Sequence, residues 1–145
     1  MFNIRVVRTI PKPVNVVFAI LVDHEGYARF PGVDHARIVE PGDTSRNGVG
    51  ALREVHIGPV RFWERITVVE PNVRLSYHIE QSRPFPMDHK DGTLMFESLD
   101  TNETRVTWTS DGHITIPLIG GLIDRVLERQ GNTGFSVALK AVGRL

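Results

Sequence analysis

The sequence contains no cysteine among its 145 residues. This absence excludes disulfides, thiolate metal sites and cysteine nucleophiles, and it removes any sequence argument for an oxidising compartment. An excess of charge of one sign is lacking too, because 17 Lys and Arg residues balance 17 Asp and Glu residues. Nucleic-acid-binding proteins typically carry a basic excess, so we expect no nucleic-acid partner.

Long apolar runs are also absent, and no stretch approaches the roughly 18 residues of a membrane-spanning helix. The first residues alternate like a strand and lack the apolar block of a signal peptide. We therefore expect a cytoplasmic protein with no stable membrane insertion, either a monomer or a homodimer. The composition, 41% hydrophobic and 23% charged, allows a real core, and the length predicts one domain over residues 1–145.

The N-terminal third of the chain predicts a strand followed by two short helices. Apolar alternation predicts a strand over residues 2–9. Pro13 then suits the first turn of a helix, where its missing N–H has no cost. The helix has one apolar stripe at i, i+3, i+4 and i+7, formed by Val14, Val17, Phe18 and Leu21. A second short helical turn is expected over residues 25–30.

The rest of the chain predicts β-hairpins and one long helix. Further strands are expected over residues 35–40, 50–57, 60–70, 73–81, 90–99 and 104–113, and the two prolines within 83–86 predict an irregular segment there. A final apolar helix is expected over residues 118–144. Gly131 and Gly134 in its middle each cost about 1 kcal/mol relative to alanine. They indicate either a kink or break, or space for a ligand or the sheet; we expect one bent helix.

An ordered set of short motifs resembles the START-like, or SRPBCC, superfamily, and specifically its polyketide cyclase/dehydrase and lipid-transport branch. In chain order the motifs are Pro13-x-x-x-Val17-Phe18-x-x-Leu21-x-Asp23, Tyr27-x-x-Phe30-Pro31-Gly32-Val33, Gly48-Val49-Gly50-x-x-Arg53, Phe62-x-Glu64-x-Ile66-Thr67-x-x-Glu70-Pro71, Leu75-x-Tyr77, Gly92-Thr93-Leu94 and Thr104-Arg105-Val106-Thr107-Trp108. The resemblance covers most of the chain. It implies an α+β helix-grip fold: a curved seven-stranded antiparallel sheet around a long C-terminal helix, with two short helices after the first strand and a cavity between sheet and helix.

Strand alternation predicts which side chains face the inside of such a sheet. The residues expected to point inward are Ala51, Arg53, Val55 and Ile57; Val60, Phe62, Glu64, Ile66 and Val68; Leu75, Tyr77 and Ile79; and Leu94, Phe96, Val106 and Trp108. The set is apolar except for Arg53, Glu64 and the Tyr77 hydroxyl. A lone buried charge is costly, so Arg53 and Glu64 each need a partner. Two interpretations remain open: an ion pair that satisfies only itself, or a polar anchor that orients a ligand.

The histidines offer weaker signals. His78 falls on the outer face of its strand, whereas His24 ends the first helix, and His89 follows Asp88 in the irregular segment. A histidine beside an acid is a possible general base, because its pKa is near neutrality. The simpler interpretation places His24 and His89 at a cavity rim with no chemistry. No two histidines have metal-binding spacing, so we expect no metal site and no cofactor.

Two functions follow from these patterns and from the resemblance. The first is binding or transport of a small hydrophobic ligand, such as a lipid, an isoprenoid, a quinone or a polyketide-like molecule, in an internal cavity. The ligand-binding residues expected for it are Arg53, Phe62, Glu64, Ile66, Tyr77, Phe96, Trp108, Ile123 and Leu127. The alternative is an enzyme of the polyketide cyclase/dehydratase type, with Glu64 and His89 as the catalytic candidates. Because no complete catalytic constellation is visible, the sequence favours a binding protein over an enzyme.

Overall fold

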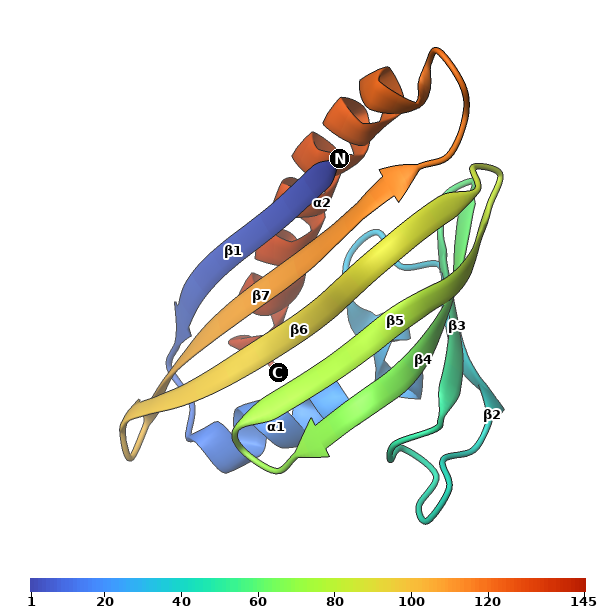
Figure 1. Cartoon of the computed structure of the whole chain (residues 1–145). Helices are drawn as coiled ribbons and strands as arrows, with labels where there is room; N and C mark the ends of the chain where they lie inside the picture. The colour runs from blue at the N-terminus through green and yellow to red at the C-terminus, as the bar shows by residue number, and fades with distance from the viewer.

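A computed structural model describes all 145 residues and shows one curved antiparallel sheet that holds a long helix (Figure 1). The elements are β1 (Phe2–Ile10), α1 (Val14–Val22), η1 (Glu25–Arg29, a 3-10 helix), β2 (His35–Glu40), β3 (Leu52–Ile57), β4 (Val60–Glu70), β5 (Arg74–Arg83), β6 (Met87–Asp100), β7 (Glu103–Ile114) and α2 (Gly120–Val142). The strand order is β1-β7-β6-β5-β4-β3-β2. The expected α+β helix-grip fold is confirmed.

The short helices close one end of the sheet, and their apolar stripe is the one the sequence predicts. Val17, Phe18 and Leu21 are buried in the core, and the Phe18 ring meets the Phe96 ring of β6 edge-on at 5.0 Å between centroids. Burial of such side chains contributes about 1.5–3 kcal/mol each. Helix α1 therefore forms one wall of the core.

Most inward-facing residues of the strands lie where alternation predicts them. Leu75, Tyr77, Leu94, Val106 and Trp108 are all buried. β4 differs because its register with β5 shifts between Ile66 and Val68, where a bulge lies. A bulge inserts one residue and so exchanges the two faces of the strand.

The bulge overturns one prediction, and a strand end overturns another. Val69, not Val68, packs against the core, and it stands opposite Leu75. Ile57 was also expected inside, yet it is exposed because it ends β3 beside the Gly58–Pro59 turn. Two strands also extend beyond their predicted limits, since β5 continues to Arg83 and β6 already begins at Met87.

Helix α2 is continuous through both of its central glycines, but only its C-terminal half is gripped by the sheet. Ala138, Leu139 and Val142 are buried, and the ring of Phe135 stacks on Trp108 at 3.9 Å between centroids. The helix packs mainly on β1 and β7. Its N-terminal half buries only Gly120 and Asp124, so this half lies over the sheet without being sealed to it.

The two glycines of α2 have different surroundings. A β-carbon on Gly131 would overlap the Ile4 side chain of β1, whereas one on Gly134 would meet nothing within 4 Å. Gly131 therefore provides space for the sheet, which is one of the two interpretations left open by the sequence. Gly134 has no packing reason to be glycine.

We expect opposite effects from alanine at these two positions. Gly134→Ala should raise the free energy of unfolding by about 0.5–1 kcal/mol, because alanine has the higher helix propensity and no neighbour obstructs it. Gly131→Ala should lower it by about 1–2 kcal/mol, because Ile4 must move. Urea unfolding of both variants measures the difference. Equal effects would mean that β1 does not approach α2 this closely.

Candidate functional site

The polar centre of the molecule is an ion pair between β3 and β4. Arg53 and Glu64 stand directly opposite each other in the ladder, and Arg53 Nε donates to Glu64 Oε1 at 2.7 Å. The Arg53 side chain is only 1% exposed. Both side chains therefore reach the inner face, as alternation predicts.

Two tyrosine rings enclose the guanidinium group of Arg53. Its central carbon lies 4.6 Å from the ring centroid of Tyr27 and 4.9 Å from that of Tyr77. A cation over a desolvated aromatic face gains about 2 kcal/mol. The hydroxyls have partners of their own: Tyr27 donates to the Leu21 carbonyl at 2.7 Å, and Tyr77 accepts from Trp108 Nε1 at 3.0 Å. Burial raises the pKa of both tyrosines, so both rings remain neutral.

His24 completes this cluster, which overturns the prediction that it lies at a cavity rim. The residue is fully buried, because the β2–β3 loop covers it. Its Nε2 bonds the Asn47 carbonyl at 2.9 Å, so Nε2 holds the proton, and Nδ1 accepts from Arg53 Nη1 at 3.1 Å. Desolvation, with the positive charge of Arg53 as the second cause, lowers the pKa of His24 to about 3. His24 is therefore a neutral acceptor for Arg53.

His89 also lies elsewhere than predicted. It belongs to strand β6 and is buried, with its ring stacked on Tyr77 at 5.8 Å between centroids. Nδ1 accepts from the Ile79 backbone N–H at 2.9 Å, so Nε2 carries the proton and donates to Ser110 Oγ at 2.9 Å. Desolvation, followed by the nearby His78, lowers the pKa of His89 to about 4. Both nitrogens are engaged, and Nε2 in this tautomer cannot take a proton from Ser110.

The position of His89 has a structural cause. The β5–β6 ladder extends only as far as the Tyr77–Gly92 pair, so the next backbone donor of β5 needs another partner. The imidazole of His89 supplies it to Ile79. This histidine joins two strands at the point where their backbones separate.

The Arg53 cluster keeps two polar atoms without partners in the chain. Arg53 donates through Nε and Nη1, and no hydrogen bond joins its Nη2 to another group. Glu64 accepts at Oε1 only. One donor and one acceptor on the same ion pair thus remain available to a ligand or to water.

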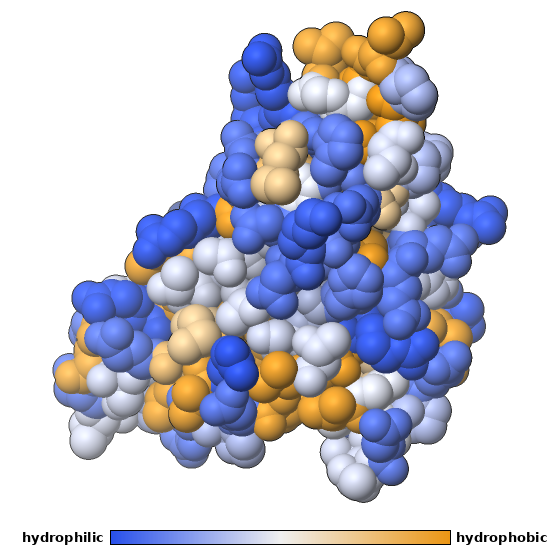
Figure 2. Space-filling model, in the orientation of Figure 1, coloured by the Kyte–Doolittle hydropathy of each residue, from blue (hydrophilic) through white to orange (hydrophobic).

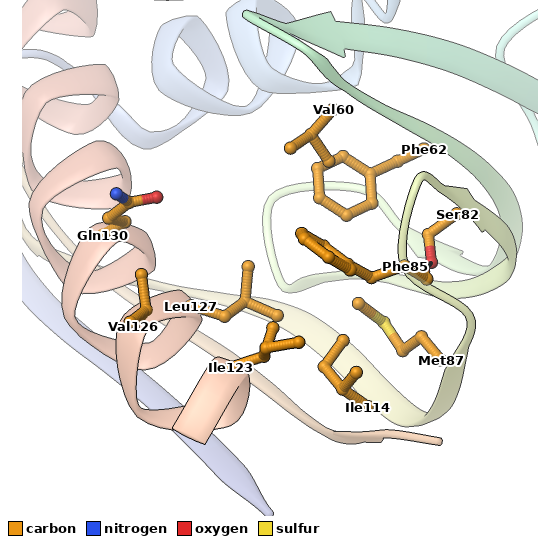
Figure 3. Close-up of a pocket in the computed structure, with 10 residues that line it drawn as sticks. All are labelled: Val60, Phe62, Ser82, Phe85, Met87, Ile114, Ile123, Val126, Leu127 and Gln130. Carbon is orange, nitrogen blue, oxygen red and sulfur yellow. Dashed lines mark hydrogen bonds between the residues drawn. The ribbon is translucent and has the colours of Figure 1, made fainter. Parts of the chain in front are cut away.

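An apolar cavity lies apart from this cluster, beside the N-terminal half of α2 (Figure 3). Its volume is about 70 Å³, and it is open to solvent. The lining residues are Val60, Phe62, Ser82, Phe85, Met87, Ile114, Ile123, Val126, Leu127 and Gln130, of which eight are hydrophobic. Figure 3 shows Phe62 and Phe85 pointing into the space from the sheet side, facing Ile123 and Leu127 of α2.

The predicted ligand-binding residues divide into three groups in the structure. Phe62, Ile123 and Leu127 line the cavity. Arg53, Glu64 and Tyr77 form the polar cluster, and Ile66, Phe96 and Trp108 are packed in the core. The centre of the expected cup is therefore filled by large side chains, and the open space lies at one end of it.

Two lining residues that sequence reasoning missed come from the irregular segment and its end. Phe85 lies between two prolines in the β5–β6 turn, and Met87 begins β6. Large apolar residues in a proline-containing turn were the available signal, because loops normally carry polar side chains.

The structure contains no group of three or more His, Asp or Glu side chains that could hold a metal ion. None of its helices is both long and apolar enough to cross a membrane.

Comparisons with known proteins agree with this architecture. The family described as "Polyketide cyclase / dehydrase and lipid transport" matches residues 1–142. No match is found among curated proteins.

Several solved structures share the fold. A START superfamily protein from Mycobacterium smegmatis superposes with a TM-score of 0.80 at 11% identity, covering 99% of both chains. The Zhui aromatase/cyclase from Streptomyces sp. R1128 has a TM-score of 0.79 at 19% identity, covering 98% of this chain and 93% of that one. A protein from Thermus thermophilus has a TM-score of 0.76 at 23% identity, covering 98% of this chain and 94% of that one. At these identities the likeness establishes the fold alone.

Removing one member of the ion pair should cost more than removing both. Glu64→Ala leaves the Arg53 guanidinium buried without its carboxylate, so we expect a loss of about 3–5 kcal/mol in the free energy of unfolding. The double change Arg53→Leu, Glu64→Leu should be milder, because no charge stays behind. Thermal or denaturant unfolding of the three proteins measures this. An unchanged midpoint for Glu64→Ala would show that the carboxylate does not serve the buried guanidinium.

Acid should destabilise the fold between pH 6.5 and about 4. His24 and His89 have folded pKa values of about 3 and 4, below the ordinary 6.5. Below pH 6.5 these two histidines are therefore protonated in the unfolded chain but stay neutral in the folded one. Stability is thus retained above pH 6.5 and lost as the pH falls. At 1.36 kcal/mol per pKa unit, moving from pH 6.5 to 5 should cost roughly 2 kcal/mol per histidine.

The His24→Asn variant tests whether His24 contributes to this pH dependence. An amide oxygen can replace Nδ1 as the acceptor for Arg53. Urea midpoints at pH 7.5 and 5 should differ less in this variant than in the wild type. The matched control is His35→Asn, at an exposed histidine of β2, which should keep the full difference. If His24→Asn also keeps it, His24 is not the titrating group.

Proposed function

The chain belongs to the polyketide cyclase/dehydrase and lipid-transport family, and on this premise we propose that it binds a small hydrophobic ligand between α2 and the β4–β6 side of the sheet. The observation that carries the proposal is the open apolar cavity beside the half of α2 that the sheet does not seal. Ligand sites are typically concave, apolar and supplied with few polar groups. This cavity has that composition.

The size of the cavity limits how a ligand enters. At about 70 Å³, it is far smaller than the roughly 300–1,000 Å³ of sites that enclose a drug-sized molecule. Binding therefore requires side chains to move. Phe85 is suited to this, because it is 39% exposed in the turn between β5 and β6. The N-terminal half of α2 buries few side chains, but Asp124 anchors it by accepting from the Ile114 N–H and pairing with the Met1 amino group. A ligand would therefore widen the space mainly by displacing Phe85.

The lining also limits the chemistry of the ligand. Its only polar side chains are Ser82 and Gln130, and the Ser82 hydroxyl already donates to the Phe85 carbonyl. The Ser82 oxygen can still accept a hydrogen bond, and Gln130 can donate or accept one, so both can bond a polar group of the ligand at the cavity edge. The lining thus supports a mainly apolar ligand with a single polar end, such as a lipid, an isoprenoid, a quinone or a polyketide-like molecule.

A cyclase- or dehydratase-type reaction is the second candidate, and the Arg53 cluster is the observation that favours it. The unpartnered Nη2 of Arg53 could stabilise an enolate oxygen, and Oε2 of Glu64 could accept a proton. A deeper opening toward the cluster would be needed for a substrate to reach these atoms. The double change Arg53→Leu, Glu64→Leu separates the candidates: a binding protein keeps ligand with altered affinity, whereas an enzyme loses all turnover.

A bulky residue inside the cavity should weaken ligand binding. Ile123→Trp fills the space from α2, so we expect at least a tenfold weaker affinity for cis-parinaric acid, a fluorescent fatty acid. The matched control is Val137→Trp, on the same helix but outside the cavity, which should bind within twofold of the wild type. Fluorescence titration measures both. Equal affinities would place the binding site elsewhere, and mass spectrometry of extracts from the gently purified protein would then search for the natural ligand.

A further inference from the structure

Helix α2 runs along β1, which is an edge strand, and its side chains bond the free backbone of that edge (Figure 1). Glu128 Oε1 accepts from the Asn3 N–H at 2.7 Å, and Asn132 Oδ1 accepts from the Arg5 N–H at 3.2 Å. Four residues of a helix advance about 6 Å, and two residues of a strand advance about 6.6 Å. Side chains four positions apart on α2 therefore meet alternate residues of β1.

The series of acceptors along α2 ends before it reaches Thr9. Because β1 pairs with β7 without a register shift, the N–H groups of Val7 and Thr9 point to the same free edge as the two that are bonded. Val7 is at the level of Ser136, whose oxygen can accept. Thr9 is at the level of Lys140, whose ammonium group can only donate. Donors therefore meet at Thr9, and the acceptor that the pattern requires is missing.

A cavity of about 190 Å³, open to solvent, lies at this point. Arg8, Thr9, Lys140 and Arg144 all contribute to its lining. None of the three cations forms an ion pair, and their only hydrogen bond runs from Arg8 Nη1 to Ser136 Oγ at 3.5 Å. Other arginines of the chain are unpaired too, but these three cations line one cavity together with an unbonded backbone N–H. We call this cavity the β1–α2 cavity.

No carboxylate lines the β1–α2 cavity. Strand β1, helix α1 and the part of α2 after Glu128 contain no Asp or Glu, and Glu128 and Asp124 are both bonded near the other end of β1. On β7, Glu103 and Asp111 alternate with buried residues and so lie on the outer face of the sheet. Asp100 bonds a backbone N–H of its own turn. Figure 2 shows mainly hydrophilic residues along the side of the molecule that β1 forms.

The end of a helix by itself attracts cations, because its last carbonyls carry about half a negative charge. Lys12 meets this need here, since its Nζ donates to the Leu145 oxygen. Lys140 and Arg144 donate to no carbonyl of the helix, and Arg8 belongs to the strand. Three full positive charges also outweigh the partial charge of the helix end. The helix terminus therefore does not account for the cations of the β1–α2 cavity.

We propose that the β1–α2 cavity binds the phosphate group of a small soluble molecule, with one phosphate oxygen accepting from the Thr9 N–H. The guanidinium groups of Arg8 and Arg144 match the geometry of phosphate oxygens, and Lys140 adds a point charge. Three cations without a carboxylate suit a doubly charged phosphate better than a singly charged carboxylate. The site lies at the opposite end of α2 from the apolar cavity, and it does not depend on the proposed function.

Amide NMR spectra test the site directly. The protein labelled with nitrogen-15 is titrated with inorganic phosphate or glycerol 3-phosphate at constant ionic strength. We expect the Thr9 amide proton to shift downfield, whereas Asn3 and Arg5, whose N–H groups are already bonded, should not respond. Acetate should bind about tenfold more weakly, because it carries one charge less. A Thr9 amide that ignores both phosphates overturns the proposal, and equal affinity for acetate overturns the assignment to phosphate.

A matched pair of variants separates the site from general charge attraction. Lys140→Gln supplies the missing acceptor for Thr9 and removes a charge, so glycerol 3-phosphate should bind about tenfold more weakly. The control Arg129→Gln removes an exposed charge of the same helix outside the cavity. It should keep the affinity within about twofold, because it lies about 16 Å along the helix, beyond the Debye length of about 8 Å. Equal losses in the two variants would overturn the site.

A lipid headgroup offers the same phosphate chemistry, and vesicles distinguish this source. The protein is mixed with vesicles of phosphatidylcholine that contain phosphatidic acid and is then sedimented. We expect it to remain in the supernatant. Co-sedimentation that Lys140→Gln abolishes and Arg129→Gln retains would overturn the soluble ligand and replace it with a headgroup.

Discussion

The buried guanidinium of Arg53 is the constraint around which the interior is organised. A charge at 1% exposure cannot remain without compensation, because its transfer from water costs several kcal/mol. Glu64 supplies the opposite charge, His24 a neutral acceptor, and the two tyrosines a pair of aromatic faces. These partners come from the α1–η1 region and from strands β4 and β5, so the pairing joins the short helices to the sheet.

This polar centre and the side chains around it fill the middle of the sheet's inner face, so the open space lies elsewhere. Large side chains close the middle of the cup, and helix α2 completes the closure with its C-terminal half through the Phe135–Trp108 stack and the buried Leu139. The N-terminal half of α2 has no such contacts, because the helix packs mainly against β1 and β7. The cavity forms on the side of this half that faces β4–β6. A helix that is sealed to the core at one end, and held at the other by polar contacts of Asp124 and Glu128, leaves an apolar lining open to a ligand while the core stays intact.

The apolar side chains at the N-terminal end of α2 face in two directions. Ile123 and Leu127 face the cavity, while Leu118 and Leu122 face solvent. Phe85 lines the cavity and is also 39% exposed, so this one side chain connects the cavity lining with the outer surface. It lies in a turn with a proline on each side.

The sequence by itself determined the fold and the polar centre, because both depend on local patterns. Alternation with period two places Arg53 and Glu64 inside whatever the ligand is, and the ordered motifs specify the helix-grip arrangement. The tertiary structure alone decided the rest. A bulge in β4 turned Val69 inward in place of Val68, and a register shift never appears in a strand's own pattern. The β2–β3 loop covers His24. His89 is inside because it bonds a β5 backbone N–H at the point where β5 and β6 separate. Helix α2 packs on β1 and β7, so the cavity lies at Phe85 rather than at the centre. The path of a helix across a sheet depends on contacts between residues more than a hundred positions apart, such as Ile4 and Gly131.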